Sequence, residues 1–141
     1  NTLWKDSGSK PLCDKLILLN RTLHGIWFSY KGALPDIFCL VHPMGTVLGN
    51  AVYANYLVVQ QGATVNTGSS EGTPQLGEYL YLGAGAKIIG DMTIGHDVNI
   101  GVDACVYKKD VQDNITVYKD ENGSIQYKER DDFWAARGYF L

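Results

Sequence analysis

The chain has 141 residues and a formal net charge of −3, and 45% of its residues are hydrophobic. This length fits one domain, and the acidic balance gives no basic field that would attract nucleic acid. No apolar run approaches the roughly 20 residues that span a membrane. We therefore expect a chain that binds neither nucleic acid nor membrane.

Cys13, Cys39 and Cys105 are few, odd in number and without a recurring spacing. We predict free thiols rather than a disulfide framework, and a reducing, cytoplasmic location. Cys39 and His42 have the spacing of a metal-binding pair, but no second pair accompanies them, so no metal site is predicted. No signal peptide is visible, and the start at Asn1 leaves processing or an N-terminally truncated fragment open.

Residues 1–25 are predicted to form an N-terminal arm and a capping helix. Pro11 suits a first helical turn, and Gly25 suits a helix end. Leucines recur at helical spacing on one face, namely Leu12, Leu16, Leu19 and Leu23. We expect this apolar face to cover the end of the β structure that follows.

Residues 26–117 are predicted to form a left-handed parallel β-helix, so the fold class is mainly β. An aliphatic residue returns every six positions at Leu76, Leu82, Ile88, Ile94, Ile100 and Val106. A second apolar row follows four positions later at Leu80, Ala86, Met92, Val98 and Ala104. A period of six fits neither a helix nor an ordinary strand, but it is typical of hexapeptide repeats whose short strands stack in triangular coils.

The same six-residue count is expected further upstream, with the inward positions at Val41, Val47, Tyr53, Val59 and Val65. The count breaks over residues 66–75, which are polar and rich in Gly and Ser. This stretch is predicted to be a loop ejected from the coil, and such loops often carry function.

Residues 118–141 are predicted to form a hairpin return and an aromatic tail. Asn122-Gly123 separates two runs with strand character and is a strong hairpin signal. The tail contains Phe133, Trp134, Tyr139, Phe140 and Leu141. We expect these aromatics to pack on the chain's own coil or on a neighbouring subunit.

Three segments occur in a fixed order: HPMGTVLG at 42–49, QGATV at 61–65 and LGAGAKIIG at 82–90. Together they resemble the catalytic part of the serine acetyltransferases and related hexapeptide acyltransferases. The resemblance implies transfer of an acetyl group from acetyl-CoA to a hydroxyl, with His42 as the general base. A backbone N–H of a glycine corner such as Gly62 is expected to stabilise the oxyanion. The family also implies a homotrimer with shared sites and a role in cysteine biosynthesis.

The resemblance also assigns cofactor-binding residues. Gly83, Ala84, Gly85 and Ala86 match positions where small residues let the pantetheine arm lie along the coil. Lys108 and Lys109 fall where a lysine often meets the phosphates of CoA, although a solvated end of the coil explains this pair equally well.

The acceptor side departs from the family pattern. Trp27 stands where the family has the aspartate that orients the catalytic histidine, and Asp36 is the nearest carboxylate that could replace it. Asn50 replaces a glutamate, and Asn50 and Thr64 are the substrate-binding candidates. The acceptor is expected to be L-serine or a sugar, and neutral and aromatic groups such as Asn50, Tyr53 and Tyr56 would hold the sugar. A non-catalytic β-helix scaffold is a further alternative.

Overall fold

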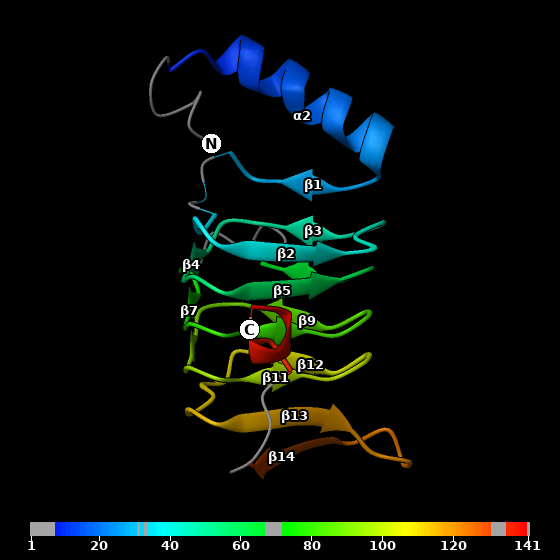
Figure 1. Cartoon of the computed structure of the whole chain (residues 1–141), viewed down its shortest axis with the longest axis vertical. Coiled ribbons are helices and arrows are strands. Elements are labelled where there is room, and N and C mark those ends of the chain that lie inside the picture. The colour runs from blue at the N-terminus through cyan, green and yellow to red at the C-terminus, as the bar shows by residue number, and fades with distance from the viewer. Residues whose placement is uncertain (1–7, 31, 33, 67–71, 131–134, 141) are drawn as a thin grey trace.

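The computed structural model describes residues 8–30, 32, 34–66, 72–130 and 135–140. Short strands stack in successive coils, with a helix at the N-terminal end and an antiparallel hairpin at the other end (Figure 1). No helix within these described ranges is long and apolar enough to cross a membrane. Cys13, Cys39 and Cys105 are free thiols.

Three sheets form the sides of a triangular prism. The five-stranded sheet consists of β1 (Trp27–Phe28), β3 (Val47–Leu48), β6 (Thr64–Val65), β9 (Lys87–Ile89) and β12 (Cys105–Tyr107). The three-stranded sheet consists of β4 (Val52–Tyr53), β7 (Gln75–Leu76) and β10 (Thr93–Ile94). The six-stranded sheet consists of β2 (Phe38–Val41), β5 (Leu57–Gln60), β8 (Tyr81–Leu82), β11 (Asn99–Ile100), β13 (Ile115–Lys119) and β14 (Ile125–Glu129). Neighbouring strands are parallel, except that β13 and β14 are antiparallel.

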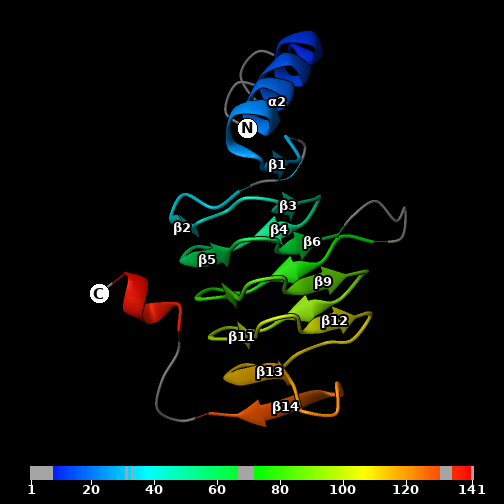
Figure 2. The ribbon, with the colours of Figure 1, turned by 90° about the vertical axis from the view of Figure 1, so that its right-hand side faces the viewer.

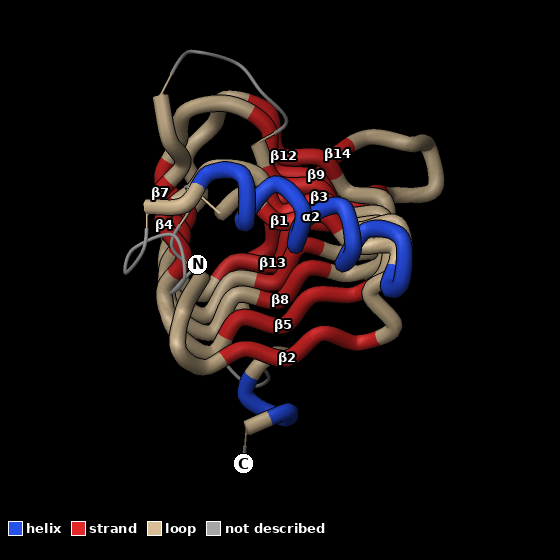
Figure 3. The backbone as a smooth tube through the Cα atoms, turned by 90° about the horizontal axis from the view of Figure 1, so that it is seen from above, coloured by secondary structure: helices blue, strands red, loops and turns tan. Residues whose placement is uncertain are grey.

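The coil is left-handed, as predicted. Figure 3 looks down the coil from the helix end, and the chain passes from β2 to β3 to β4 counterclockwise while it moves away from the viewer. One corner of each turn is made by a residue with left-handed φ immediately before or near a strand of the six-stranded sheet. These residues are Tyr56 (65°), Tyr79 (56°), Asp97 (55°) and Asn114 (60°).

The two predicted inward rows are confirmed from Leu76 to Val106. Every residue of both rows is buried, with exposures between 0 and 5%. The inward row continues beyond the predicted end, since Val111 and Val117 are 3% and 0% exposed. These aliphatic side chains form one continuous core along the prism, which is the main source of its stability.

The predicted inward row is wrong at its upstream end. Val41 and Val47 are only half-buried, whereas Leu48 is 1% exposed and Leu40 packs against the core. Leu40 is paired with Val59 across the six-stranded sheet, so it occupies the inward position of its coil. The inward residues are therefore Leu40, one position before the predicted Val41, and Leu48, one position after the predicted Val47.

The predicted N-terminal helix is confirmed as α2 (Lys10–His24), and Gly25 ends it in the left-handed region with φ 65°. Its predicted capping face is wrong. The four leucines are exposed, with values of 42% for Leu12, 39% for Leu16, 52% for Leu19 and 65% for Leu23. The helix instead meets the coil along an adjacent stripe, where Cys13 is buried and the Asn20 amide donates a 3.1 Å hydrogen bond to the Ile26 carbonyl. Residues 1–7 of the predicted arm lie outside the described residues.

The predicted hairpin is confirmed as β13 and β14, but its loop is longer than two residues because Lys119 pairs with Ile125. Asp120 organises this loop by accepting hydrogen bonds from the backbone N–H groups of Asn122 (3.0 Å) and Ser124 (2.8 Å). Such carboxylate-to-backbone bonds are typical of Asp in turns.

After the hairpin, residues 135–140 lie back against the outer face of the six-stranded sheet (Figures 2 and 3). They include the short 3₁₀ helix η1 (Arg137–Tyr139). Val58 faces outward from this sheet yet is 0% exposed, and Ala136 is also 0% exposed. The expectation that the aromatic tail packs on the chain's own coil is thus confirmed for Tyr139 and Phe140, whereas Phe133, Trp134 and Leu141 lie outside the described residues.

Candidate functional site

His42 lies at the corner between the six-stranded and the five-stranded sheets. Six positions separate Val41 from Val47, whereas their partners in the next coil, Gln60 and Thr64, are four positions apart. This corner therefore holds two more residues than the corner below it. His42 itself is exposed and has φ 49°, so the extra residues carry the imidazole on a turn that projects from the coil.

Local hydrogen bonds hold this turn in place. The N–H of Met44 donates to the His42 carbonyl at 2.7 Å, and the N–H of Thr46 donates to the Pro43 carbonyl at 3.2 Å. The N–H of Gly45 donates to the carbonyl of Gly25 at 2.8 Å. The glycine that ends α2 thus ties the helix to the turn that carries His42.

The glycine-rich segment predicted to bind CoA lies in the same corner, two coils below His42. The Gly62 N–H donates to Met44 at 3.0 Å, and the Gly85 N–H donates to Gln61 at 2.9 Å. We call this column of turns, residues 42–45, 61–62, 83–85 and 101–103, the His42 stack. The structure thereby brings together the candidate base and the candidate cofactor segment. It also engages the Gly62 N–H, so this group is not available as the predicted oxyanion donor.

The four small residues of the cofactor segment differ in accessibility. Ala84 and Gly85 are half-buried, whereas Gly83 and Ala86 are buried. Ala86 is 0% exposed because it belongs to the second inward row. Only the first pair can therefore present a surface to a ligand, and Ala86 has a packing role.

Asp36 and His42 lie at opposite ends of β2. The backbone N–H of Asp36 donates to the Asn55 side-chain oxygen at 3.0 Å, at the corner between the three-stranded and six-stranded sheets. The four residues of β2 separate the two side chains, which is more than about 13 Å of extended chain. The structure does not bring Asp36 to the imidazole.

The remaining predicted residues lie across the five-stranded sheet from His42. Asn50, Lys108 and Lys109 are at the corner between this sheet and the three-stranded sheet, and all three are exposed. Lys109 Nζ lies 3.7 Å from the centre of the Tyr127 ring. Thr64 is between the two corners, on the outer face of the sheet in register with Lys87. The predicted site is therefore spread over one side of the prism.

Tyr53 and Tyr56 are not available to a sugar. Tyr53 is 7% exposed and donates its hydroxyl to the Gly49 carbonyl at 3.0 Å, and burial raises the pKa of its phenol. The Tyr56 ring stacks on Tyr79 with a centroid distance of 4.4 Å, at the corner opposite the five-stranded sheet.

A pocket of about 640 Å³ lies against the outer side of β1 and β3, close to the end of α2. Its described lining includes Gly45 and Thr46 from the turn that carries His42, and Asn50 from the far corner. Side chains that the sequence analysis did not assign to binding also line it, namely Arg21, Trp27 and Asn66. The sequence carried no clear signal for these three residues. Trp27 was noted only as a departure from the family pattern, and Arg21 resembles an ordinary cation in the last turn of a helix. Asn66 belongs to the polar stretch 66–75.

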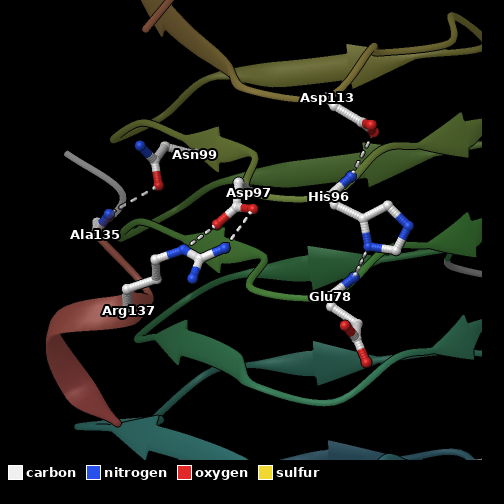
Figure 4. A network of polar contacts seen from close by, with 7 residues as sticks. All are labelled: Glu78, His96, Asp97, Asn99, Asp113, Ala135 and Arg137. Carbon is white, nitrogen blue, oxygen red and sulfur yellow. Dashed lines mark hydrogen bonds and ion pairs between the residues drawn. The ribbon is translucent and has the colours of Figure 1, made fainter. Parts of the chain in front are cut away.

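A second polar network lies at the opposite corner and supports the C-terminal segment (Figure 4). Arg137 makes a bidentate ion pair with Asp97, with N–O distances of 2.6 and 2.8 Å. His96 accepts a 3.1 Å hydrogen bond from the Glu78 N–H through Nδ1. The backbone N–H of His96 donates to the Asp113 carboxylate at 2.8 Å. These contacts join successive coils and give His96 a structural role. No cluster of three or more metal-binding side chains occurs among the described residues.

Comparison with known proteins identifies relatives that share this architecture. The chain is 33% identical over 119 residues to a serine acetyltransferase of Synechococcus elongatus, which corresponds to 81% of this chain and 48% of that protein. It is 38% identical over 69 residues to a serine acetyltransferase of Helicobacter pylori. The chain is a serine acetyltransferase homologue. It spans about half the length of the Synechococcus relative, and no family model matches it.

Solved serine acetyltransferases have the same fold as this homologue. The Neisseria gonorrhoeae enzyme superposes with a TM-score of 0.79 and 29% identity, over 91% of this chain and 49% of that one. The same Neisseria enzyme in complex with serine gives a TM-score of 0.76 over 84% of this chain. A serine acetyltransferase in complex with cysteine gives a TM-score of 0.82 at 23% identity, which supports the fold alone. The predicted hexapeptide-repeat fold and family likeness are confirmed.

Proposed function

We propose that this chain carries an acetyl-CoA-dependent O-acetyltransferase site on the side of the prism formed by the five-stranded sheet, with His42 as the general base. The observation that carries the proposal is the His42 stack, in which the histidine turn lies in one column with Ala84 and Gly85. The likeness to serine acetyltransferases over 81% of the chain supports the same chemistry.

In this mechanism, the His42 imidazole takes the proton of the acceptor hydroxyl as the oxygen attacks the thioester carbonyl. A carbon–oxygen bond forms, the carbon–sulfur bond breaks, and the CoA thiolate leaves with the electron pair and takes up the proton. A histidine is suited to this task because its ordinary pKa lies close to neutral pH. Asp36 does not reach the imidazole of its own chain, so it can orient the ring only from a second subunit.

The cofactor is expected to lie along the His42 stack. Ala84 and Gly85 leave room for a narrow, extended arm. Lys87 Nζ donates to the Gly85 carbonyl at 2.8 Å and thereby fixes the turn from within the sheet. Lys108 and Lys109 remain candidates for the phosphates, at the other edge of the same side of the prism.

A homotrimer is part of the proposal. The His42 stack exposes two large apolar side chains, Met44 at 71% and Val102 at 64%. A second copy packed against this column would bury them and enclose the thioester. Sedimentation that shows a monomer at micromolar concentration would remove this part of the proposal.

The test measures release of CoA thiol from acetyl-CoA with L-serine and with neutral, amino and acidic sugars. His42→Ala should lower kcat/KM by about two orders of magnitude or more, as expected for loss of a general base. His96→Ala is the matched control, because His96 is also exposed but lies at another corner. Equal rates for the native chain and His42→Ala would contradict the proposal.

The alternative is a non-catalytic scaffold, which is favoured by one observation. Asp36, the carboxylate expected to replace the missing aspartate, lies at the far end of β2 from His42. Retention on immobilised CoA separates the two functions, because a scaffold has no reason to bind the cofactor. Failure to bind CoA together with absence of thiol release would favour the scaffold.

A further inference from the structure

The pocket beside β1 and β3 continues directly from the turn that carries His42. Gly45 and Thr46 line one end of it, three and four residues after the histidine, and Asn50 and Asn66 line the other end. Trp27 is in register with Val47 on the outer face of the sheet, so both side chains form the wall between the two ends. A ligand in this pocket would therefore contact the turn that carries the candidate base.

The charge of the pocket is positive. Arg21 is the only charged side chain among the described residues that line it. No ion pair joins Arg21 to a carboxylate within the described parts of the chain. A guanidinium binds carboxylate and phosphate groups through paired hydrogen bonds, so Arg21 selects for an anion.

The far end of the pocket offers a hydrogen-bond acceptor. Asn66 is 5% exposed, and its side-chain N–H donates to the Asn50 carbonyl at 2.6 Å. Its Oδ1 atom is buried without a hydrogen-bond partner in the described structure. Buried polar atoms are normally paired, so a hydroxyl from a ligand that opens this end of the pocket would satisfy it.

Trp27 supplies the wall between the cation and the acceptor. It occupies the position where the resemblance implied an aspartate, so the site has exchanged a carboxylate for a flat apolar surface. Such a surface suits the carbon-bound face of a sugar ring. The described lining of the pocket offers no carboxylate to pair with an ammonium group, and Arg21 disfavours a second positive charge.

We propose that this pocket is the acceptor site and that the acceptor is an anionic sugar, with its carboxylate or phosphate on Arg21, its ring on Trp27 and a hydroxyl toward Asn66. The inference rests on the proposed function and narrows its acceptor. A sugar acid and a sugar phosphate share the required chemistry, whereas L-serine carries an ammonium that this pocket does not accommodate.

The test measures binding without acetyl-CoA, by calorimetric titration with D-glucuronate, D-glucose 6-phosphate, D-glucose and L-serine. At least one of the two anionic sugars should bind about ten- to a hundredfold more tightly than glucose, as expected for a charge-assisted hydrogen-bond pair. Arg21→Gln should abolish this preference. Lys15→Gln, which removes a positive charge from an exposed site on the same helix, should preserve it.

Each other result overturns the inference. These results are equal affinity for glucose, tightest binding of L-serine, an anion preference that survives Arg21→Gln, and no binding of any of the four compounds. Thiol release measured in parallel separates the two proposals. Arg21-dependent binding without thiol release would refute the acetyltransferase function but support the pocket assignment. Turnover of serine or glucose that Arg21→Gln does not change would support the acetyltransferase function but refute the pocket assignment.

Discussion

The lower coils, from Leu76 to Val106, and the upper coils, from Phe28 to Val65, form the same three sheets but differ in regularity. In the lower coils the inward residues return every six positions, and both rows are buried throughout. In the upper coils the corner at His42 holds two extra residues. The predicted loop at 66–75 falls between β6 and β7, and its residues 67–71 lie outside the described residues. The candidate base and the pocket both lie where the repeat is interrupted. Regular coils thus provide the support, and the interruptions provide the chemistry.

The largest expected loss of stability is for a substitution in the middle of the core, and it should exceed the loss at the N-terminal end of the core. Ile88→Ala should lower the free energy of unfolding by about 2–5 kcal/mol, because Ile88 is fully buried between neighbouring coils and the prism cannot collapse into the cavity. Leu40→Ala should cost less, since Leu40 is only half-buried. Urea unfolding measures both. Equal losses would show that the upper coil is packed as tightly as the lower ones.

Glycine corners provide the next comparison. A Cβ at Gly77 would overlap the backbone carbonyl of Gly95 in the coil below, and backbone cannot move aside easily. Gly77→Ala should therefore cost about 1–3 kcal/mol. In Gly45→Ala the new methyl group would lie at an ordinary contact distance of 3.9 Å from the Gly62 Cα, but φ is 73°. The substitution should therefore cost about 1 kcal/mol from backbone strain alone. Thermal unfolding should give a larger loss of stability for Gly77→Ala than for Gly45→Ala. A larger loss for Gly45→Ala would contradict this comparison.

The C-terminal segment should depend on its ion pair. Arg137→Gln removes the bidentate contact with Asp97, in which the arginine side chain is 43% and the aspartate 13% exposed. Because of this partial exposure, we expect a loss of about 1 kcal/mol, confined to residues 135–140. Hydrogen exchange at Val58 and Tyr81, which the segment covers or contacts, should accelerate. Unchanged exchange would show that the aromatic contacts hold the segment alone.

The smallest expected effect is a pH dependence at the hairpin. The side chain of Gln126 and the backbone N–H groups of Ser124 and Asn122 donate to Asp120 and lower the pKa of its carboxyl. Ionised Asp120 therefore stabilises the folded hairpin above the ordinary pKa, and this contribution is lost as the pH falls through the lowered value. An NMR titration should place the Asp120 midpoint below that of an unstructured aspartate, and a normal midpoint would contradict these contacts.

Local patterns were sufficient to predict several parts of the molecule. The six-residue period predicted the β-helix because the side chains of a narrow prism must alternate in a fixed order, whatever lies outside it. Gly25 predicted the helix end, and Asn122-Gly123 predicted the hairpin. His42 and the glycine-rich segment were grouped by the family resemblance, and the structure places both in the His42 stack.

The remaining features depend on contacts that no local pattern encodes. The face that α2 turns to the coil was mispredicted because its leucines are the more apolar stripe, yet Asn20 and Cys13 make the contact. Asp36 is close to His42 in sequence but is carried to another corner by the length of β2. The pocket combines Arg21, Trp27 and Asn66 from a helix, a strand and a loop. The sequence by itself thus determined the regular repeat from Leu76 to Val106, because that repeat follows from side-chain periodicity. Only the tertiary structure decided how the corner at His42 departs from the repeat and which side chains meet there.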